Sequence, residues 1–368
     1  MTHSTPLQNL FDKHLDTMIT VGFHALAIIG FIVFTMIATM GAKAQTADLA
    51  KPDLAKSDLA CEGRNLMLDL PPSSLVSAKV EAAKVPNGTG LFWKIEKTGQ
   101  AASWLYGTMH VTDPRIANLP DSVNQAIDNA DTVVIETLDL LDPQKAQTAI
   151  LMNPDLTTFT DGNTLTSQMS AEDKAFVEAE LNARGISPKL VSRMKPWMIM
   201  SLVAASACED ARKVSGKEIL DFKIINRAKD HNKNLDGLET ITEQLSAMAS
   251  LPIDFQINGL VETLRLGDKL SDITETMMQL YISEEIALIT PALKAVAKQL
   301  GGEEMDEADF GAFEAKIILA RNYLMAERAE PILKAGNAFI AVGAMHLPGD
   351  EGVIELLRKQ GYDITRAN

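Results

Sequence analysis

The chain has 368 residues, of which 46% are hydrophobic and 23% are charged, as is usual for a globular protein of one large domain or two ordinary ones. Its formal net charge is −15 at pH 7. A protein that binds nucleic acid needs clustered Lys and Arg against the phosphates, so this charge argues against nucleic acid as a partner.

The N-terminal segment is expected to direct export. Residues 17–42 contain no Asp, Glu, Lys or Arg, and Ala42-Lys43-Ala44 follows as an A-x-A cleavage pattern. Because an apolar stretch before small cleavage-site residues is typical of a secretory signal, we interpret residues 1–44 as a signal peptide. The 26 uncharged residues are also long enough for an uncleaved anchor associated with the membrane. Both interpretations place the rest of the chain in the periplasm or cell envelope.

The folded part is expected to begin near the first cysteine. Residues 45–60 are small, polar and charged, which is typical of a linker. The chain has two cysteines, Cys61 and Cys208, and both follow the predicted cleavage site. In an oxidising compartment an isolated pair predicts a disulfide, with two separate buried thiols as the alternative.

The first half of the predicted sheet begins with a hairpin over residues 91–106, whose second strand runs into Gly-x-x-His110. A Leu-Pro pair follows, and Asp121 is expected to cap a helix over residues 122–129. A buried strand over residues 132–136 then ends in an acidic residue.

The C-terminus repeats this order of elements. An apolar run over residues 338–342 leads to Gly343-x-x-His346, another Leu-Pro pair, a helix over 353–360 and a strand over 362–366. Strand–helix–strand crossovers build parallel sheets. We therefore predict an α/β fold with a central mixed or parallel sheet, built from two pseudo-symmetric β-GxxH-α-β units that bring both histidines to one edge.

The middle of the chain, about residues 143–334, is predicted to be a large helical insertion. The pattern Thr240-x-x-Glu243 is a capping box that opens a helix. Residues 235–239 form the one plausible short strand, and residues 308–333 show the apolar spacing of a single long helix.

Two imidazoles and one carboxylate form a common site for a divalent metal such as zinc, with a position left open for water. His110 and His346 are expected to supply the imidazoles and Glu136 the carboxylate. Glu136 would either bind the metal or take a proton from the bound water. Arg321, on the long helix, is expected to stabilise negative charge that develops during the reaction.

Each of these residues also has a structural interpretation. A histidine at the end of an apolar strand is often simply hydrogen-bonded. Glu136 could be an ordinary acid at a strand end, and Arg321 could be solvated or pair with an acid on another element. Glu239 and Asp221 could support the site, cap a helix or lie on the surface.

Taken together, the motifs resemble those of the TraB/GumN family from about residue 61 to residue 366. The flanking segments 90–95 and 361–366 also match. The matching motifs are Gly107-x-x-His110, Val133-Val134-Ile135-Glu136, Gly237-Leu238-Glu239-Thr240, Arg321-Asn322 and Gly343-x-x-His346.

The resemblance implies one domain over residues 61–368, with the fold of the erythromycin-esterase and ChaN-like group. It implies that His110, His346, Glu136 and Arg321 form the active site. Gly107, Gly343, Glu239, Asn322 and Asp221 are expected to support them.

The animal relatives in this family are the Tiki metalloproteases, which need Mn or Co. The resemblance therefore implies an exported metal-dependent hydrolase that acts on a peptide or protein. Because one fold can host several chemistries, two alternatives stay open. They are a non-catalytic protein that binds heme or a similar ligand, and an accessory protein of the cell envelope.

Overall fold

The computed structural model describes residues 63–300 and 307–367. Six strands form one sheet in the order β4-β3-β5-β2-β1-β6. Their bounds are β1 Phe92–Glu96, β2 Ser103–Thr108, β3 Thr132–Ile135, β4 Asn234–Gly237, β5 Ala338–Gly343 and β6 Asp363–Arg366.

Four neighbouring strands run in the same direction. β5 pairs in parallel with β2 on one side and with β3 on the other, and β3 pairs in parallel with β4. β1 is antiparallel to both β2 and β6, so the sheet is mixed. The carboxyl ends of β4, β3, β5 and β2 therefore lie along one edge, where α/β proteins usually bind ligands.

The predicted mixed α/β sheet is confirmed, but its pseudo-symmetry is not. In the strand order, the connection from β2 to β3 passes over β5 alone, whereas the connection from β5 to β6 passes over β2 and β1. The two units therefore resemble each other in sequence but not in their place in the sheet. The capping prediction for Asp121 is wrong, because Asp121 is the first residue of its helix and Pro120 occupies the cap position.

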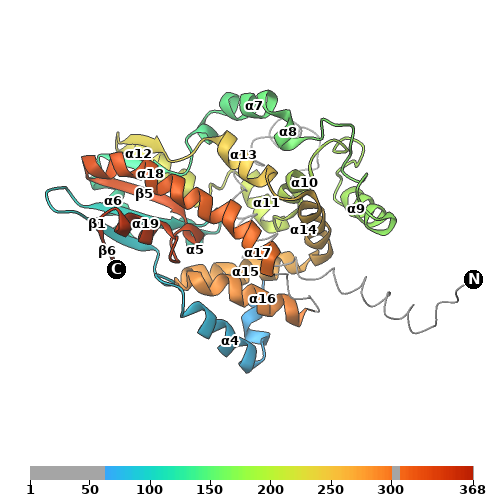
Figure 1. Cartoon of the computed structure of the whole chain (residues 1–368), viewed down its shortest axis with the longest axis horizontal. Coiled ribbons are helices and arrows are strands. Elements are labelled where there is room, and N and C mark those ends of the chain that lie inside the picture. Colours follow the sequence, from blue (N-terminus) through green and yellow to red (C-terminus); the bar gives the residue numbers. More distant parts are fainter. Residues whose placement is uncertain (1–62, 301–306, 368) are drawn as a thin grey trace, which may run out of the picture.

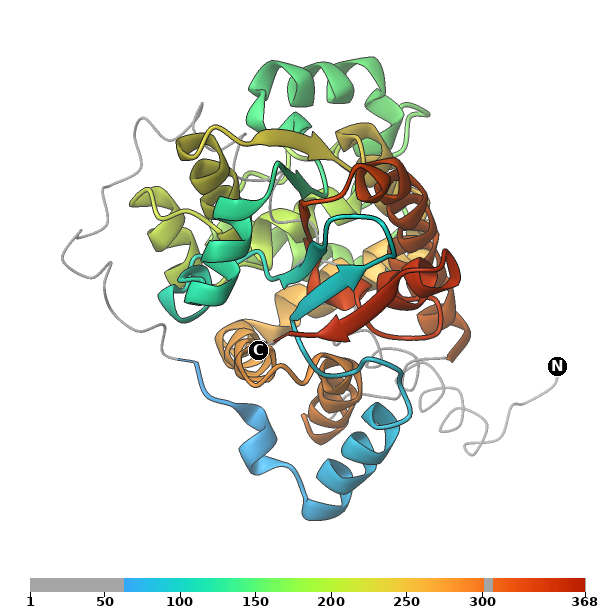
Figure 2. The same cartoon turned by 90° about the vertical axis from the view of Figure 1, so that its left-hand side faces the viewer.

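Helices cover both faces of the sheet (Figures 1 and 2). Their bounds are α4 Pro72–Ala82, α5 Pro114–Ala117, α6 Asp121–Asn129, α7 Pro143–Met152, α8 Pro154–Thr157, α9 Ala171–Ala183, α10 Pro196–Val203, α11 Ala207–Val214, α12 Leu220–Asp230, α13 Ile241–Ala249, α14 Ile253–Leu266, α15 Lys269–Ile282, α16 Ile289–Gln299, α17 Glu307–Glu314, α18 Ala320–Ala335 and α19 Val353–Lys359.

Alternating side chains of the sheet enter two separate cores. Ile340 and Val342 of β5 pack into a core that α18 and α19 close, with Met325 and Leu357 among its residues. Phe339, their neighbour on the same strand, points to the opposite face and joins a larger core shared with the helical region. This alternation buries the central strand β5 on both faces, as its uninterrupted apolar sequence predicts.

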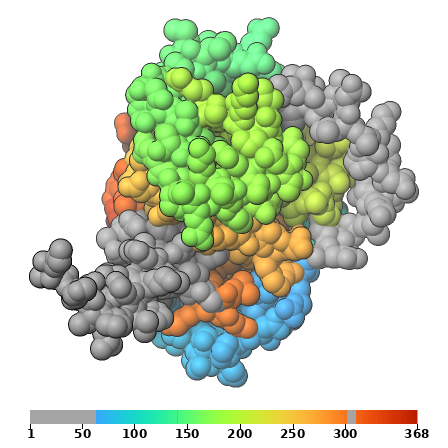
Figure 3. Space-filling model, turned by 90° about the vertical axis from the view of Figure 1, so that its right-hand side faces the viewer, coloured from blue at the N-terminus to red at the C-terminus, as the bar shows by residue number. Residues whose placement is uncertain are grey.

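The helical region lies beside the sheet. Figure 3 shows the face of the molecule farthest from the sheet, where the green helical segments lie above orange and blue ones. The predicted capping box is confirmed, since the Thr240 hydroxyl accepts from the Glu243 amide and the Glu243 carboxylate accepts from the Thr240 amide. The strand predicted over residues 235–239 is present as β4, Asn234–Gly237. It begins one residue earlier than predicted and ends two residues earlier.

The long helix predicted over 308–333 contains a local change of winding. α17 and α18 are joined by η5 (Ala315–Leu319), a π-helical turn. A π turn inserts one extra residue and so rotates everything that follows it, often at functional sites. Here it ends at Leu319, two residues before Arg321.

No helix within residues 63–300 and 307–367 is both long and apolar enough to cross a bilayer. The predicted signal or anchor over 1–44, the linker over 45–60 and Cys61 lie outside the described residues. The pairing of Cys61 with Cys208 on α11 therefore stays a prediction.

Buried ion pairs anchor the segment that follows His110. Asp113 accepts from Arg115 Nε at 2.9 Å and from Arg212 Nη1 of α11 at 2.9 Å. Burial would raise the pKa of Asp113, but these hydrogen bonds hold it at about 2. The Asp113 oxygen also accepts from the Arg115 amide and so caps α5.

We expect Asp113→Asn to lower the free energy of unfolding by about 3 kcal/mol at pH 7, because the buried Arg212 guanidinium loses its partner while the helix cap is kept. A depressed carboxyl pKa stabilises the fold above the unfolded-state value and ceases to do so as pH falls through the folded-state value. The difference between wild type and variant should therefore be constant above pH ~5 and shrink towards pH ~2.

Chemical denaturation at a series of pH values measures this difference. Asp128→Asn, at a partly exposed pair with Arg227, is the control and should cost about 1 kcal/mol or less. An equal loss at pH 7 and near pH 2 would contradict the assignment.

Candidate active site

Each of the four parallel strands presents one polar residue just beyond its carboxyl end. These residues are Glu239 after β4, Glu136 after β3, His346 after β5 and His110 after β2. All four side chains are buried, with at most 5% of their surface exposed. The parallel register of adjacent strands is what brings residues more than 200 positions apart in the sequence to one edge.

Arg321 bridges the two glutamates. Its guanidinium donates to Glu239 through Nε at 2.9 Å and Nη2 at 2.7 Å, and to Glu136 through Nη2 at 2.8 Å. The interpretation of Arg321 as partner of an acid on another element is thus correct. Two carboxyl groups thus share this one cation, which compensates a single negative charge.

Glu136 is held by contacts on both of its oxygens. Oε2 accepts from Arg321 and from Gln244 Nε2 at 3.2 Å, while Oε1 accepts from the Gly343 amide at 2.7 Å. Burial would raise the pKa of Glu136, but the Arg321 charge lowers it to about 2. Glu136 is therefore ionised at neutral pH, whereas burial raises the pKa of its neighbour Glu239.

His346 has a defined tautomer. Asn322 donates through Nδ2 to the Glu351 carbonyl at 2.8 Å, so its Oδ1 faces the His346 ring and accepts from Nδ1 at 2.6 Å. The proton on Nδ1 leaves a lone pair on Nε2. Burial and the Arg321 charge lower the pKa of His346 to about 3, so the ring is neutral at pH 7.

The His346 Nε2 atom is buried and lacks any hydrogen-bond partner among the described residues. It lies 3.9 Å from Glu136 Oε1. With metal–ligand bonds of about 2.0–2.2 Å, two ligand atoms on one ion lie at most roughly 4.4 Å apart. Imidazole Nε2 and carboxylate Oε1 therefore suit a shared divalent ion in both chemistry and separation.

His110 is oriented by a carboxylate. Its Nδ1 donates to Asp221 Oδ2 of α12 at 2.7 Å, and Asp221 Oδ1 accepts from the Thr108 hydroxyl at 3.1 Å. Burial would lower the pKa of His110, but the Asp221 charge and hydrogen bond raise it. A carboxylate on the second nitrogen is the usual support of a metal-bound histidine.

The glycines of the two Gly-x-x-His motifs allow close packing. A Cβ on Gly107 would lie 2.7 Å from the Leu347 side chain and 3.1 Å from Ala344 Cα, so the first motif packs directly on the second. A Cβ on Gly343 would lie 3.1 Å from Glu136 Oε1. A larger residue at either position would therefore push on a neighbouring side chain of the site.

Apart from the two cysteines, nine site residues were predicted, and the structure places all nine in this region of the molecule. Asp221 and Glu239 neither cap a helix nor lie on the surface, because both are buried and bonded to His110 and Arg321 respectively. As positioned, however, no three His, Cys, Asp or Glu side chains among the described residues lie close enough together to hold a metal. The pair His346 and Glu136 fits a metal in chemistry and separation.

Sequence reasoning missed Gln244, whose amide donates to both Glu136 and Glu239. The position of Gln244 in its helix could have identified it from the sequence. Ile241, Leu245 and Met248 form the apolar stripe of α13, and Gln244 lies within that stripe. A polar residue on a buried helical face needs a partner, which here is the pair of carboxylates.

Comparison with known proteins agrees with these motifs. Residues 91–366 match the model of the TraB/PrgY/gumN family. The chain is 25% identical over 322 residues to the protein named Metalloprotease TIKI homolog of Nematostella vectensis, covering 76% of this chain and 67% of that protein. It is 24% identical over 312 residues to Metalloprotease TIKI1 of Danio rerio, covering 74% of this chain and 62% of that protein.

A bacterial relative matches over more of its own length. The Uncharacterized protein YbaP of Escherichia coli (strain K12) is 21% identical over 254 residues, which cover 69% of this chain and 87% of that protein. The chain therefore spans about two thirds or less of the Tiki relatives but most of the bacterial one. No solved structure gave a significant match.

We expect Arg321→Met to lower the free energy of unfolding by about 3–5 kcal/mol, because two buried carboxylates lose their shared cation. Arg328→Met is the matched control on the same helix, where the partly exposed pair with Glu243 should contribute about 1 kcal/mol or less. Equal losses in the two variants, measured by chemical denaturation, would refute the role given to Arg321.

The tautomer of His346 is directly measurable. In metal-free protein at neutral pH, ¹⁵N NMR should show Nδ1 protonated and Nε2 unprotonated. Asn322→Leu removes the acceptor but keeps the branched shape of the side chain. It should shift the population towards the Nε2-protonated form, since that form is preferred by free imidazole side chains. A wild-type spectrum with the proton on Nε2 would be the contrary result.

Proposed function

The chain belongs to the TraB/PrgY/gumN family, and from this membership we propose that it is a metal-dependent hydrolase that cleaves peptide bonds. Two of its relatives are named metalloproteases. The observation that carries the proposal is the buried, unpartnered Nε2 of His346 beside the ionised Oε1 of Glu136. A buried polar atom without a partner is costly, and a bound ion would remove that cost.

In this proposal His346, Glu136 and His110 hold the divalent ion, which would be Mn, Co or Zn. The ionised Oε1 of Glu136 favours a cation at this position. His110 is included as third ligand because it lies buried beyond the carboxyl end of β2, the strand next to β5, and its Nδ1 is held by Asp221. When bound, such an ion lowers the pKa of water and polarises a carbonyl group.

The chain's own residues would then orient the ligands. Asn322 keeps the lone pair of His346 on Nε2, and Asp221 keeps the Nδ1 proton of His110. Arg321 donates a hydrogen bond to Oε2 of Glu136, while Oε1 lies near His346. This arrangement favours a role for Glu136 as a metal ligand over a role as a general base. Arg321 thus positions a ligand. Its predicted role in stabilising developing negative charge would need a contact beyond these two glutamates.

We retain export to the periplasm or cell envelope as part of the proposal, with residues 17–42 as signal or membrane anchor. The alternatives of heme binding and of an accessory role in the envelope stay predictions. A heme titration with a Soret shift that depends on His110 or His346 would favour the first of them.

Metal analysis tests the proposal. Purified protein should bind about one divalent ion per chain, and His346→Ala or Glu136→Gln should weaken metal affinity by at least about tenfold. Asp221→Asn should weaken it by a similar factor, since it disturbs the support of His110. His231→Ala is the control, because His231 lies partly exposed beside Asp128.

Activity provides the second readout. Peptide cleavage should be lost with a chelator and return with Mn²⁺, Co²⁺ or Zn²⁺. If the protein binds no metal at micromolar supply, and His110→Ala leaves any peptidase activity unchanged, the proposal fails.

A further inference from the structure

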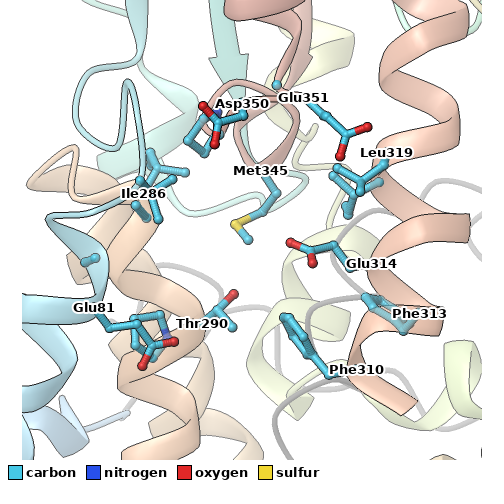
Figure 4. Close-up of a pocket in the computed structure, with 18 of the residues that line it drawn as sticks. Glu81, Ile286, Thr290, Phe310, Phe313, Glu314, Leu319, Met345, Asp350 and Glu351 are labelled. Atoms are coloured by element: carbon cyan, nitrogen blue, oxygen red, sulfur yellow. The ribbon is translucent and has the colours of Figure 1, made fainter. Parts of the chain in front are cut away.

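A cavity of about 310 Å³ lies next to the buried cluster. Its lining includes Met345, the residue before His346, and Glu351, whose carbonyl fixes Asn322. The segment that carries His346 therefore forms a wall common to the cavity and the cluster. The opposite walls come from α4, α16 and α17 (Figure 4).

The lining combines apolar surface with an excess of acidic groups. Phe310, Phe313 and Met345 provide aromatic and thioether surface that can pack on an aliphatic chain. The charged residues of the lining are four acids and one base, namely Glu81, Glu314, Asp350, Glu351 and Lys294. We call this cavity the acidic pocket.

Glu314 is the half-buried acid of the pocket. Its carboxylate points towards the Met345 thioether across the cavity (Figure 4). It makes no hydrogen bond or ion pair with any residue in the described part of the chain. A half-buried carboxylate gains more from an incoming cation than a fully exposed one, because water screens its charge less.

Lys294 indicates which chemical group the pocket accepts. Its ammonium lies 4.2 Å from the centre of the Phe310 ring and 4.0 Å from Glu81 Oε1. The pocket rim thus already holds an ammonium between an aromatic face and a carboxylate. Since 40% of the Lys294 side chain is exposed, it can move aside for a ligand.

We propose that the acidic pocket binds the side chain of a Lys or Arg residue of a peptide, placing that peptide beside the His346 segment. This inference deepens the proposed function by naming its substrate class, and it rests on that function only for the step of cleavage. A long aliphatic stem would pack on Met345 and Phe313, and the cationic end would meet Glu314.

Fluorescence anisotropy tests the inference on the full chain in chelator, where no cleavage occurs. Three labelled peptides share one uncharged background and differ at a single central residue, which is Lys, norleucine or Glu. We expect the Lys peptide to bind about tenfold more tightly than the norleucine peptide, because it adds a charge-assisted contact to the same stem, and the Glu peptide to bind more weakly still.

Glu314→Gln should remove most of this preference and leave the affinity for the norleucine peptide unchanged. Glu172→Gln makes the same charge change on the exposed surface of α9 and should have no effect. If Glu314→Gln fails to fold, Asp350→Asn serves as the second variant and should weaken only the Lys peptide. Lys294→Met should strengthen binding of the Lys peptide, since it removes a competing ammonium.

Equal affinity for the Lys and norleucine peptides would overturn the inference. It would also be overturned if the Glu peptide bound most tightly and lost that affinity in Lys294→Met, because Lys294 would then be the group that recognises the ligand. The two proposals can fail separately. If the protein prefers the Lys peptide but binds no metal, the inference about the acidic pocket holds and the proposed hydrolase activity is refuted. If it cleaves peptides in a metal-dependent way without preferring Lys, the hydrolase proposal holds and the pocket inference fails.

Discussion

The candidate active site depends on one buried guanidinium between two carboxylates. Without Arg321, two buried carboxyl groups would lie together with no cation between them, and leaving both ionised would cost several kcal/mol. With it, Glu136 stays ionised and is fixed in one orientation. Glu136 Oε1 lies 3.9 Å from the unpartnered Nε2 of His346, whose ring is neutral.

The surrounding fold is built to present these groups. Four parallel strands end at one edge, and each contributes one side chain to it. Helix α18, the last helix of the insertion, adds two more side chains, those of Arg321 and Asn322, just after the π turn η5. These consecutive residues point to different partners, one to the glutamates and the other to His346. The close contact of Gly107 with Ala344 and Leu347 then packs the two motifs together.

Burial of the cluster raises the question of how a substrate would reach it. The residues of the cluster are at most 7% exposed, whereas the neighbouring acidic pocket is open and shares the Met345–Glu351 wall with it. A peptide held in that pocket would lie against the segment that carries His346. The place where the substrate binds and the place where it reacts would thus lie on opposite sides of one segment of chain. Different side chains would control binding and reaction.

The amino-acid order alone indicated which residues can do chemistry and where the strands end. His110, His346 and Glu136 could be found because each follows an apolar strand, a pattern that local propensity and burial control. The tertiary structure alone decided that Glu239 pairs with Arg321, that Gln244 bridges the two acids and that the repeated motifs are not symmetric in the sheet. Those outcomes depend on strand order and helix phase, which arise from contacts between distant residues and leave no periodic trace in the chain.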